Sequence, residues 1–435
     1  MDFNTNTPLH TDSFTHLRNS IGLALIWIMP SLVYFVKEIL GFGGSAIFSG
    51  IFYCIGLALM LNRTSLRQAY KLNPHIAAVG ITFYLISLLY FFIFNSHPPS
   101  FTLELLNLAI ATLYILLLLR ISNDSQEYLV WTIFFATLLI NLLLIYSIST
   151  NPYFTLGARA TVQMSSKGNS EYSGNPYVYS KNGLLGFVIS LLMIQMKPVL
   201  VRNYSFLFRI LLHINLWLSL IVVLLTQTRA TFLALAIILV LYVIFVFKPK
   251  KEAFMPTKAA WIFYGIIFLF MNYINNKFHL FDIISGYYSS YATQIERALL
   301  TGSKLGKVAE QDMSAMGRVR NIEYFLSEWT HNKYNFIFGY GYRFRYMDVP
   351  ALEAFVSFGI VGLILFISLQ ATILFYAFKA LKSESLFQIF LGLIYFHTFI
   401  SIFTAGRPTD FPYWISYFIF MRFLGVTHEK ELKTL

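Results

Sequence analysis

Charged residues and cysteine are scarce in this chain of 435 residues. Only 12% of the residues are charged, against about 25% in an average soluble domain. So little charge cannot cover the surface of a soluble 50.1 kDa protein, which excludes a soluble enzyme, a disordered chain and a secreted disulfide scaffold. Cys54 is the single cysteine, so an internal disulfide and a cysteine-based metal site are excluded as well.

Metal-binding and nucleotide-binding motifs are also missing. The nine histidines are scattered without HxxxH or HExxH spacing, and the sequence has neither a P-loop nor a glycine-rich nucleotide cradle. We therefore expect no metal ion and no cofactor. The net charge of +12 does not indicate a nucleic-acid partner, because the cations lie between apolar runs instead of forming a basic patch.

Long hydrophobic runs fill most of the sequence. Hydrophobic residues make up 57% of the chain, and the mean hydropathy is +0.63. A bilayer core about 30 Å thick needs about 20 apolar residues per helix. The runs that meet this need approximately are residues 20–36, 46–61, 76–94, 101–119, 128–147, 178–196, 206–225, 231–247, 258–274, 354–378, 385–404 and 411–425. We predict an all-α polytopic protein with about twelve transmembrane helices, embedded in membrane lipid.

The lysines and arginines predict the orientation of these helices. Seventeen of them lie on alternate connections and the two tails, namely Arg63, Arg67, Lys71, Arg120, Lys197, Arg202, Arg209, Lys248, Lys250, Lys251, Lys258, Lys379, Lys382, Arg18, Arg422, Lys430 and Lys433. The opposite short connections hold six, namely Lys37, Arg159, Lys167, Lys181, Arg229 and Arg407. The side with seventeen is expected to be cytoplasmic, which places both termini inside.

One connection is much longer than the others. Residues 275–353 contain no apolar run, and they divide the chain into a first set of helices (1–274), a large extracytoplasmic loop (275–353) and a last set with the cytoplasmic tail (354–435). The loop is dense in aromatic residues, so we expect it to be folded. Amphipathic patterns predict helices at 291–300 and 318–330, and Gly339-Tyr340-Gly341 predicts a tight turn before the chain re-enters the membrane.

Arg229 is the most informative single residue. It stands in Thr226-Gln227-Thr228-Arg229, between two long apolar runs, so its guanidinium is expected close to the hydrocarbon boundary. An arginine at that depth needs a partner or a wet cavity, and a phosphate group suits its planar fork of donors. The alternative is an arginine that extends to lipid headgroups; the polar neighbours favour a buried site.

Further cations and two carboxylates are expected on the same face. Arg318 begins a predicted loop helix, Arg343 follows the Gly-Tyr-Gly turn, and Arg407 lies between the last two apolar runs. Asp348 and Glu353 precede the tenth run, where either one could take a proton from a sugar hydroxyl as a general base. The alternative for both acids is an ordinary interfacial carboxylate paired with a nearby arginine.

Three segments resemble the O-antigen polymerase and O-antigen ligase superfamily of bacterial inner-membrane glycosyltransferases. The first is Thr226-Gln227-Thr228-Arg229 with the apolar helix after it, and the second is the arginine-led segment 317–329 followed by 338–341. The third runs from Asp348 to the Gly359-Ile360-Val361-Gly362 step. The ligases usually carry a His-Asn pair eleven residues before the first glycine of this step. This chain has Asp348 and Val349 there, which favours the polymerase branch.

The resemblance implies the transfer of glycan from an undecaprenyl diphosphate carrier at the periplasmic face of the inner membrane. We expect an inverting, metal-independent polymerase that attaches the glycan to a hydroxyl of an acceptor repeat unit, with a chain-length regulator and a flippase as candidate partners. The catalytic candidates are Asp348, Arg229 and Glu353. The substrate-binding candidates are Arg318, Arg159, Arg407, Arg343 and Tyr340. The alternatives are a ligase that uses the lipid A core as acceptor and a flippase for lipid-linked sugars.

Overall fold

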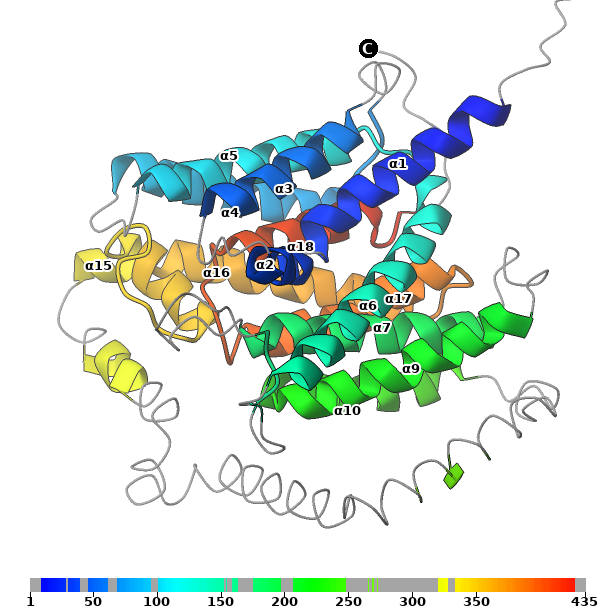
Figure 1. Cartoon of the computed structure of the whole chain (residues 1–435). Coiled ribbons are helices and arrows are strands. Elements are labelled where there is room, and N and C mark those ends of the chain that lie inside the picture. The colour runs from blue at the N-terminus through cyan, green and yellow to red at the C-terminus, as the bar shows by residue number, and fades with distance from the viewer. Residues whose placement is uncertain are drawn as a thin grey trace, which may run out of the picture.

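The computed structural model of the chain describes residues 9–28, 30–39, 46–61, 69–94, 101–151, 154, 159–162, 175–196, 206–247, 265, 268–269, 272, 320–327 and 333–426. All regular secondary structure in these ranges is helical, as predicted (Figure 1). The helices of the first half are α1 (Leu9–Trp27), α2 (Pro30–Ile39), α3 (Ala46–Met60), α4 (Pro74–Ile93), α5 (Phe101–Leu118), α6 (Ser125–Thr150) and α7 (Pro176–Met196). Those of the second half are α9 (Phe206–Thr226), α10 (Arg229–Leu241) with the π-helix η2 (Tyr242–Val246), α15 (Lys333–Phe338), α16 (Pro350–Ala380), α17 (Leu386–Ser401) and α18 (Phe411–Phe423).

The protein is a helical membrane protein. Within the described ranges, seven helices are long and apolar enough to cross a bilayer, namely α4, α5, α6, α7, α9, α10 continued by η2, and α16. Two further apolar helices, Phe48–Met60 and Leu386–Ser401, are shorter. Every predicted run overlaps one of these helices or α1, α2 or α18, except for 258–274, which lies almost wholly outside the described residues. The total of twelve spans stays a prediction.

The first predicted span differs from the structure. A single helix was expected over residues 20–36, but α1 ends at Trp27 and a separate helix, α2, begins at Pro30. Proline has no backbone N–H to donate and is favoured at the start of a helix, so the chain breaks there. In Figure 1, α2 is seen almost end-on while α1 runs obliquely across the view.

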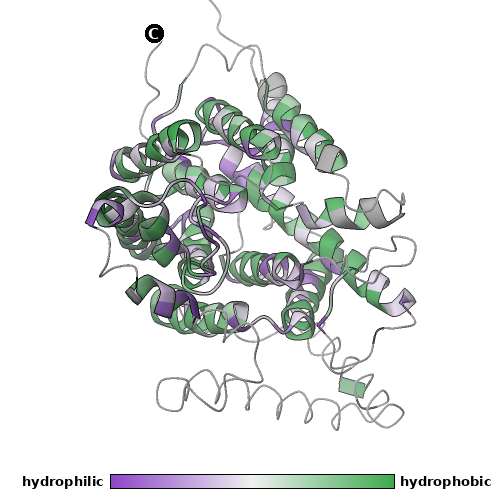
Figure 2. Cartoon of the chain, turned by 90° about the vertical axis from the view of Figure 1, so that its left-hand side faces the viewer, coloured by the Kyte–Doolittle hydropathy of each residue, from purple (hydrophilic) through white to green (hydrophobic). Residues whose placement is uncertain are grey.

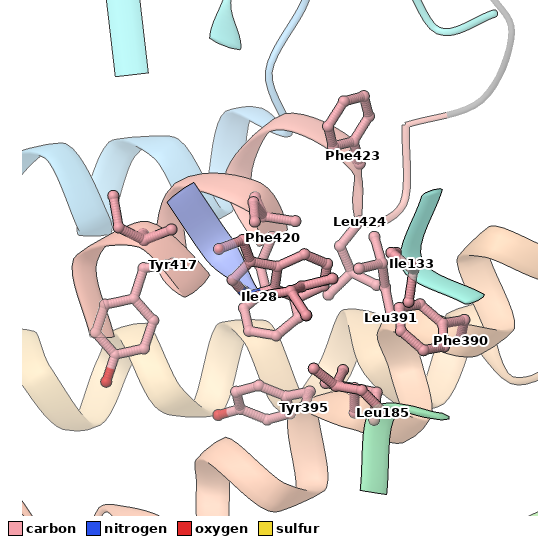
Figure 3. Close-up of a cluster of buried hydrophobic side chains, with 14 of the residues drawn as sticks. Ile28, Ile133, Leu185, Phe390, Leu391, Tyr395, Tyr417, Phe420, Phe423 and Leu424 are labelled. Carbon is pink, nitrogen blue, oxygen red and sulfur yellow. The ribbon is translucent and has the colours of Figure 1, made fainter. Parts of the chain in front are cut away.

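The last two helices form the centre of the bundle. Ten consecutive residues of α18, from Trp414 to Phe423, are buried, and so are most of those in α17. Figure 3 shows Tyr417 and Phe420 of α18 in one cluster with Tyr395 of α17 and Leu185 of α7. A helix that is apolar on all sides is typically enclosed by other helices, which explains why this short helix is central.

Hydrogen bonds show which connections share an end of the bundle. At one end, Arg422 donates to the carbonyl of Ile121 at 2.5 Å and to Asn123 Oδ1 at 2.8 Å. At the other end, Arg343 joins the start of α5 to the segment before α18, through Glu104 and Asp410. The alternation of connections predicted from the lysines and arginines, and with it the end that faces the cytoplasm, stays a prediction. Figure 2 views the bundle from the end that carries α15, where hydrophilic colour gathers on the connections.

The helix α16 is broken at Gly359, which has φ 67° and ψ −164°. The break frees the carbonyls of Val356 and Ser357, which accept the backbone N–H groups of Tyr340 at 2.8 Å and Gly341 at 3.0 Å. The predicted Gly-Tyr-Gly turn is confirmed, since Gly339 and Gly341 both have positive φ.

The part of α16 after Gly359 is long enough to cross the hydrocarbon alone, because its 21 residues, 360–380, rise about 30 Å. The segment before Gly359 therefore lies at the rim of the bundle.

Candidate functional site

Arg343 connects three separate parts of the chain at this rim through ion pairs and a hydrogen bond. Its guanidinium forms an ion pair with Glu104 in the first turn of α5 and another with Asp410 Oδ1 at 2.5 Å. Its Nε donates to Thr409 Oγ1 at 3.4 Å. Burial lowers the pKa of Arg343, but Tyr342, Asp410 and Glu104 outweigh it, so the pKa is raised and the guanidinium stays charged.

Arg407 forms the second connection. Its Nη1 lies 3.1 Å from Glu353 Oε1 and 3.2 Å from the carbonyl oxygen of Arg343. Its backbone N–H donates to Asp410 Oδ2 at 2.8 Å, and its guanidinium lies 5.0 Å from the ring centre of Tyr346. The α17–α18 connection is thereby fastened to the start of α16 and to the 339–349 segment.

Both arginines form ion pairs with carboxylates of the protein. Two cations face three acids here, namely Glu104, Glu353 and Asp410. We therefore assign Arg343 and Arg407 first of all to holding the 339–349 segment in place. Their predicted contact with substrate stays a prediction.

The two predicted general bases have different surroundings. Glu353 is 1% exposed and is held by Arg407 and by the backbone N–H of Met347, at 3.0 Å. Asp348 is partly exposed, and its Oδ1 accepts a hydrogen bond from the Tyr346 hydroxyl at 2.9 Å. A carboxylate that is accessible and held by a single neutral donor suits proton transfer better than a buried, ion-paired one.

Backbone strain is concentrated at the same end of the bundle. In the part of the chain that the structure describes, the non-glycine residues with positive φ are Gln227 (φ 50°), Arg343 (φ 53°) and Asp348 (φ 54°). Residues in this region cost about 1–3 kcal/mol each and often mark functional sites. Two of them lie in the 339–349 segment, and the third lies two residues before Arg229.

Arg229 lies at the end of the bundle that carries Arg407. It is the first residue of α10 and is partly exposed. Two residues later, Thr231 Oγ1 is 3.4 Å from Nε2 of His397, one turn before the end of α17, and α17 leads into the connection that holds Arg407. Arg229 and Asp348 therefore lie at the same end of the bundle; their proximity stays a prediction.

The remaining predicted residues are spread around this rim. Arg159 is exposed, and the backbone N–H of its neighbour Ala160 donates to the carbonyl of Leu225 at 2.9 Å, near the end of α9. The ring of Tyr340 is partly buried and stacks on Phe344 with centroids 4.7 Å apart. Arg318 and the predicted helix at 291–300 lie outside the described residues. Of the predicted helix at 318–330, residues 320–327 are helical, and Ile322 is exposed.

Three charged residues of this rim were missed by the sequence analysis as parts of a site. Glu104 and Asp410 are the acids that hold Arg343, and Lys181 lies inside α7 instead of on a connection. Glu104 and Lys181 could have been identified from the sequence, because each is a charged residue within or beside an apolar run. Such residues are rare in membrane segments and are usually functional. Asp410 follows Arg407 by three residues, but nothing local indicates its second partner.

Among the residues that the structure describes, no group of three or more His, Cys, Asp or Glu side chains is placed to hold a metal ion. Comparison with known proteins adds no further guide: no family model and no curated protein matches the chain. The case for a function rests on the residues and their geometry.

Proposed function

We propose that the protein is a surface-polysaccharide polymerase of the O-antigen type. It would transfer a glycan from an undecaprenyl diphosphate-linked donor to a sugar hydroxyl of an acceptor repeat unit, at the periplasmic face of a bacterial inner membrane. Both termini would lie in the cytoplasm, and a chain-length regulator and a flippase would be its partners. The observation that carries the proposal is Asp348, an accessible carboxylate on a strained backbone at the end of the bundle where α10 begins with Arg229.

The proposed reaction is a single inverting displacement. Asp348 takes the proton of the acceptor hydroxyl, and the oxygen attacks C1 of the donor sugar from the side opposite the diphosphate. The C1–O bond breaks, and its electron pair leaves with the diphosphate. Arg229 stabilises the negative charge that develops on that group, a role for which a fixed cation at the hydrocarbon boundary is suited. The product is a longer lipid-linked glycan and free undecaprenyl diphosphate.

The ion pairs around Asp348 support this assignment by their position. Arg343 and Arg407 hold the segment 339–349, which carries Asp348, against α5, α16 and the α17–α18 connection. A base that is held in position by neighbouring groups needs less reorganisation in the transition state. Glu353 would act through Arg407 and not as the base.

The test is polymer formation by purified protein in detergent, with undecaprenyl diphosphate-linked repeat units as the only sugar source. We expect the wild type to make a ladder of products and Asp348→Asn to lower the rate at least about a hundredfold, as expected for the loss of a general base. Arg229→Ala should also abolish long products. The matched controls are Asp124→Asn and Arg209→Ala, which change exposed residues at the opposite end of the bundle and should leave the ladder unchanged.

The same assay separates the alternatives by their products. A ligase would make no ladder alone and would transfer glycan only when lipid A core is added, while a flippase would leave the substrate unchanged in micelles. Broken helices near the midplane are typical of transporters. The break at Gly359 does not favour a flippase, because the residues after it span the hydrocarbon without the segment before it. Wild-type ladders from Asp348→Asn would remove this residue from the mechanism.

A further inference from the structure

The short helix α15 has an apolar face that the proposed reaction does not use. The side chains of Tyr334, Ile337 and Phe338 are 79%, 44% and 60% exposed. Their spacing of three and four residues places them on one face of the helix. Phe336 lies on the opposite face, and its ring centre is 5.5 Å from that of Phe355 in α16. The helix therefore packs one face on the bundle and turns an apolar face away from it.

Contacts place α15 at the level where two membrane-spanning helices end. The hydroxyl of Tyr90, in the last turn of α4, donates to the carbonyl oxygen of Phe338 at 2.7 Å. The backbone of Ile337 lies against Gly359, and the part of α16 that crosses the membrane begins after this glycine. In Figure 1, α15 lies beside the end of α16 at one end of the bundle. The boundary between lipid headgroups and acyl chains is at this level, because the spanning helices end there.

The apolar face of α15 continues surfaces of the bundle that face lipid. Exposed apolar side chains follow one side of α4 up to its end, namely Ile81, Leu85, Leu89, Phe92 and Ile93. A second exposed row begins in α16 just after the break in that helix, namely Val361, Ile364 and Ile367. Phe94, which is exposed as well, links the end of α4 to α15, since its ring centre is 5.3 Å from that of Tyr90. Rows of this kind on spanning helices face acyl chains, so lipid is the nearest apolar phase to α15.

We propose that α15 is an interfacial helix, whose face of Tyr334, Ile337 and Phe338 is inserted into the headgroup–acyl boundary of the bilayer. Aromatic residues are enriched at this boundary, where a tyrosine ring has apolar surroundings while its hydroxyl reaches headgroups and water. Exposure of the same face to water would leave three large apolar side chains uncovered beside lipid. A second copy of the chain would cover them only by displacing the lipid along α4 and α16.

This contact with lipid fixes the level of the segment that follows α15. Gly339 comes directly after the helix, and its backbone N–H donates to the carbonyl of Asn335 at 2.8 Å. The N–H of Tyr342 donates to the carbonyl of Phe94 at 3.0 Å, so the segment is held at the end of α4 as well. The interfacial position of α15 does not rest on the proposed function. That it holds Asp348 at the level of a lipid-linked substrate does rest on that function.

The test is spin-label accessibility of the full-length protein in phosphatidylcholine vesicles. Labels are attached in the Cys54→Ser background through Tyr334→Cys or Phe338→Cys, since Cys54 is the single cysteine of the chain. Collisions with oxygen, which concentrates among acyl chains, are compared with collisions with a water-soluble nickel chelate. The matched controls are Leu85→Cys, which labels the lipid-facing row of α4, and Glu384→Cys, which labels an exposed residue between α16 and α17.

Both α15 labels should give an oxygen-to-nickel collision ratio between those of the two controls, shifted toward the lipid-facing one. A ratio equal to that of the Glu384→Cys control would place the face in water and overturn the proposal. Labels that collide with neither agent would show that protein covers the face, which would overturn it too. Tyr334→Cys changes the more exposed side chain, so it carries the test if Phe338→Cys does not fold. Polymer formation is not measured, so the proposed function can fail while the interfacial helix stands, and the reverse.

Discussion

Replacing Gly359 by alanine should disrupt the rim of the bundle. Gly359 has φ 67° and ψ −164°, a combination that is almost restricted to glycine and costs other residues about 1–3 kcal/mol. A Cβ there would also overlap the backbone carbonyl of Ile337. The turn that carries Tyr340 and Gly341 must then move away from α16.

The size of the effect follows from what this movement breaks. The hydrogen bonds from Tyr340 N to Val356 O and from Gly341 N to Ser357 O are each worth about 1 kcal/mol. With the backbone strain, we expect Gly359→Ala to lose about 3–5 kcal/mol of unfolding free energy. Polymer formation should fall with it, because the 339–349 segment continues directly from this turn to Asp348.

A matched control is available at Gly50 in α3, where a Cβ would meet nothing within 4 Å. Gly50→Ala should be neutral or should stabilise the protein by about 0.5–1 kcal/mol, because glycine in a helix interior is less stable than alanine by that amount. The assays are thermal unfolding in detergent and polymer formation by both variants. If Gly359→Ala unfolds at the temperature of Gly50→Ala and keeps its activity, the account of the broken helix is wrong.

Two further predictions concern the ion pairs and the pH dependence of stability. Glu353→Gln should lower the unfolding free energy by about 3–5 kcal/mol, because it leaves Arg407 facing a neutral group. A double-mutant cycle with Arg407→Gln should give a coupling energy of at least about 1 kcal/mol. Additive effects of the two substitutions would show that the ion pair at 3.1 Å contributes nothing to stability. Tyr346 has a pKa raised above 10.0 by burial and then by the charge and hydrogen bond of Asp348, so it keeps its proton in the folded state at a pH where the unfolded chain has lost it. Its contribution to stability is therefore complete below pH 10 and is lost as the pH rises further, and Tyr346→Phe should make the decline above pH 10 shallower in unfolding measurements. An unchanged decline would show that Tyr346 does not share its proton with Asp348.

The local sequence predicted the features that depend on neighbouring residues. Apolar runs about 20 residues long predict membrane helices, because a backbone in hydrocarbon must satisfy its own hydrogen bonds. The Gly-Tyr-Gly turn at 339–341 was predicted from its glycines, and both adopt the positive φ that favours glycine. Asp348 was placed near the start of α16 from its position before an apolar run. The boundary at Pro30 was present in the sequence as well, but the apolar run across it concealed the break between α1 and α2.

Only the tertiary structure decided which charges meet. Arg343 pairs with Glu104, 239 residues earlier, and with Asp410, 67 residues later, and no periodicity in the sequence connects these positions. The same holds for Lys181, whose neighbour in the sequence, Ser180, contacts Thr231 of α10. Electrostatic interactions act through distance in space, and helix packing sets that distance after the local structure has formed. The sequence by itself therefore determined a helical membrane protein with charges at its helix ends, and the packing of α5, α16, α17 and α18 determined which of these charges are paired within the protein.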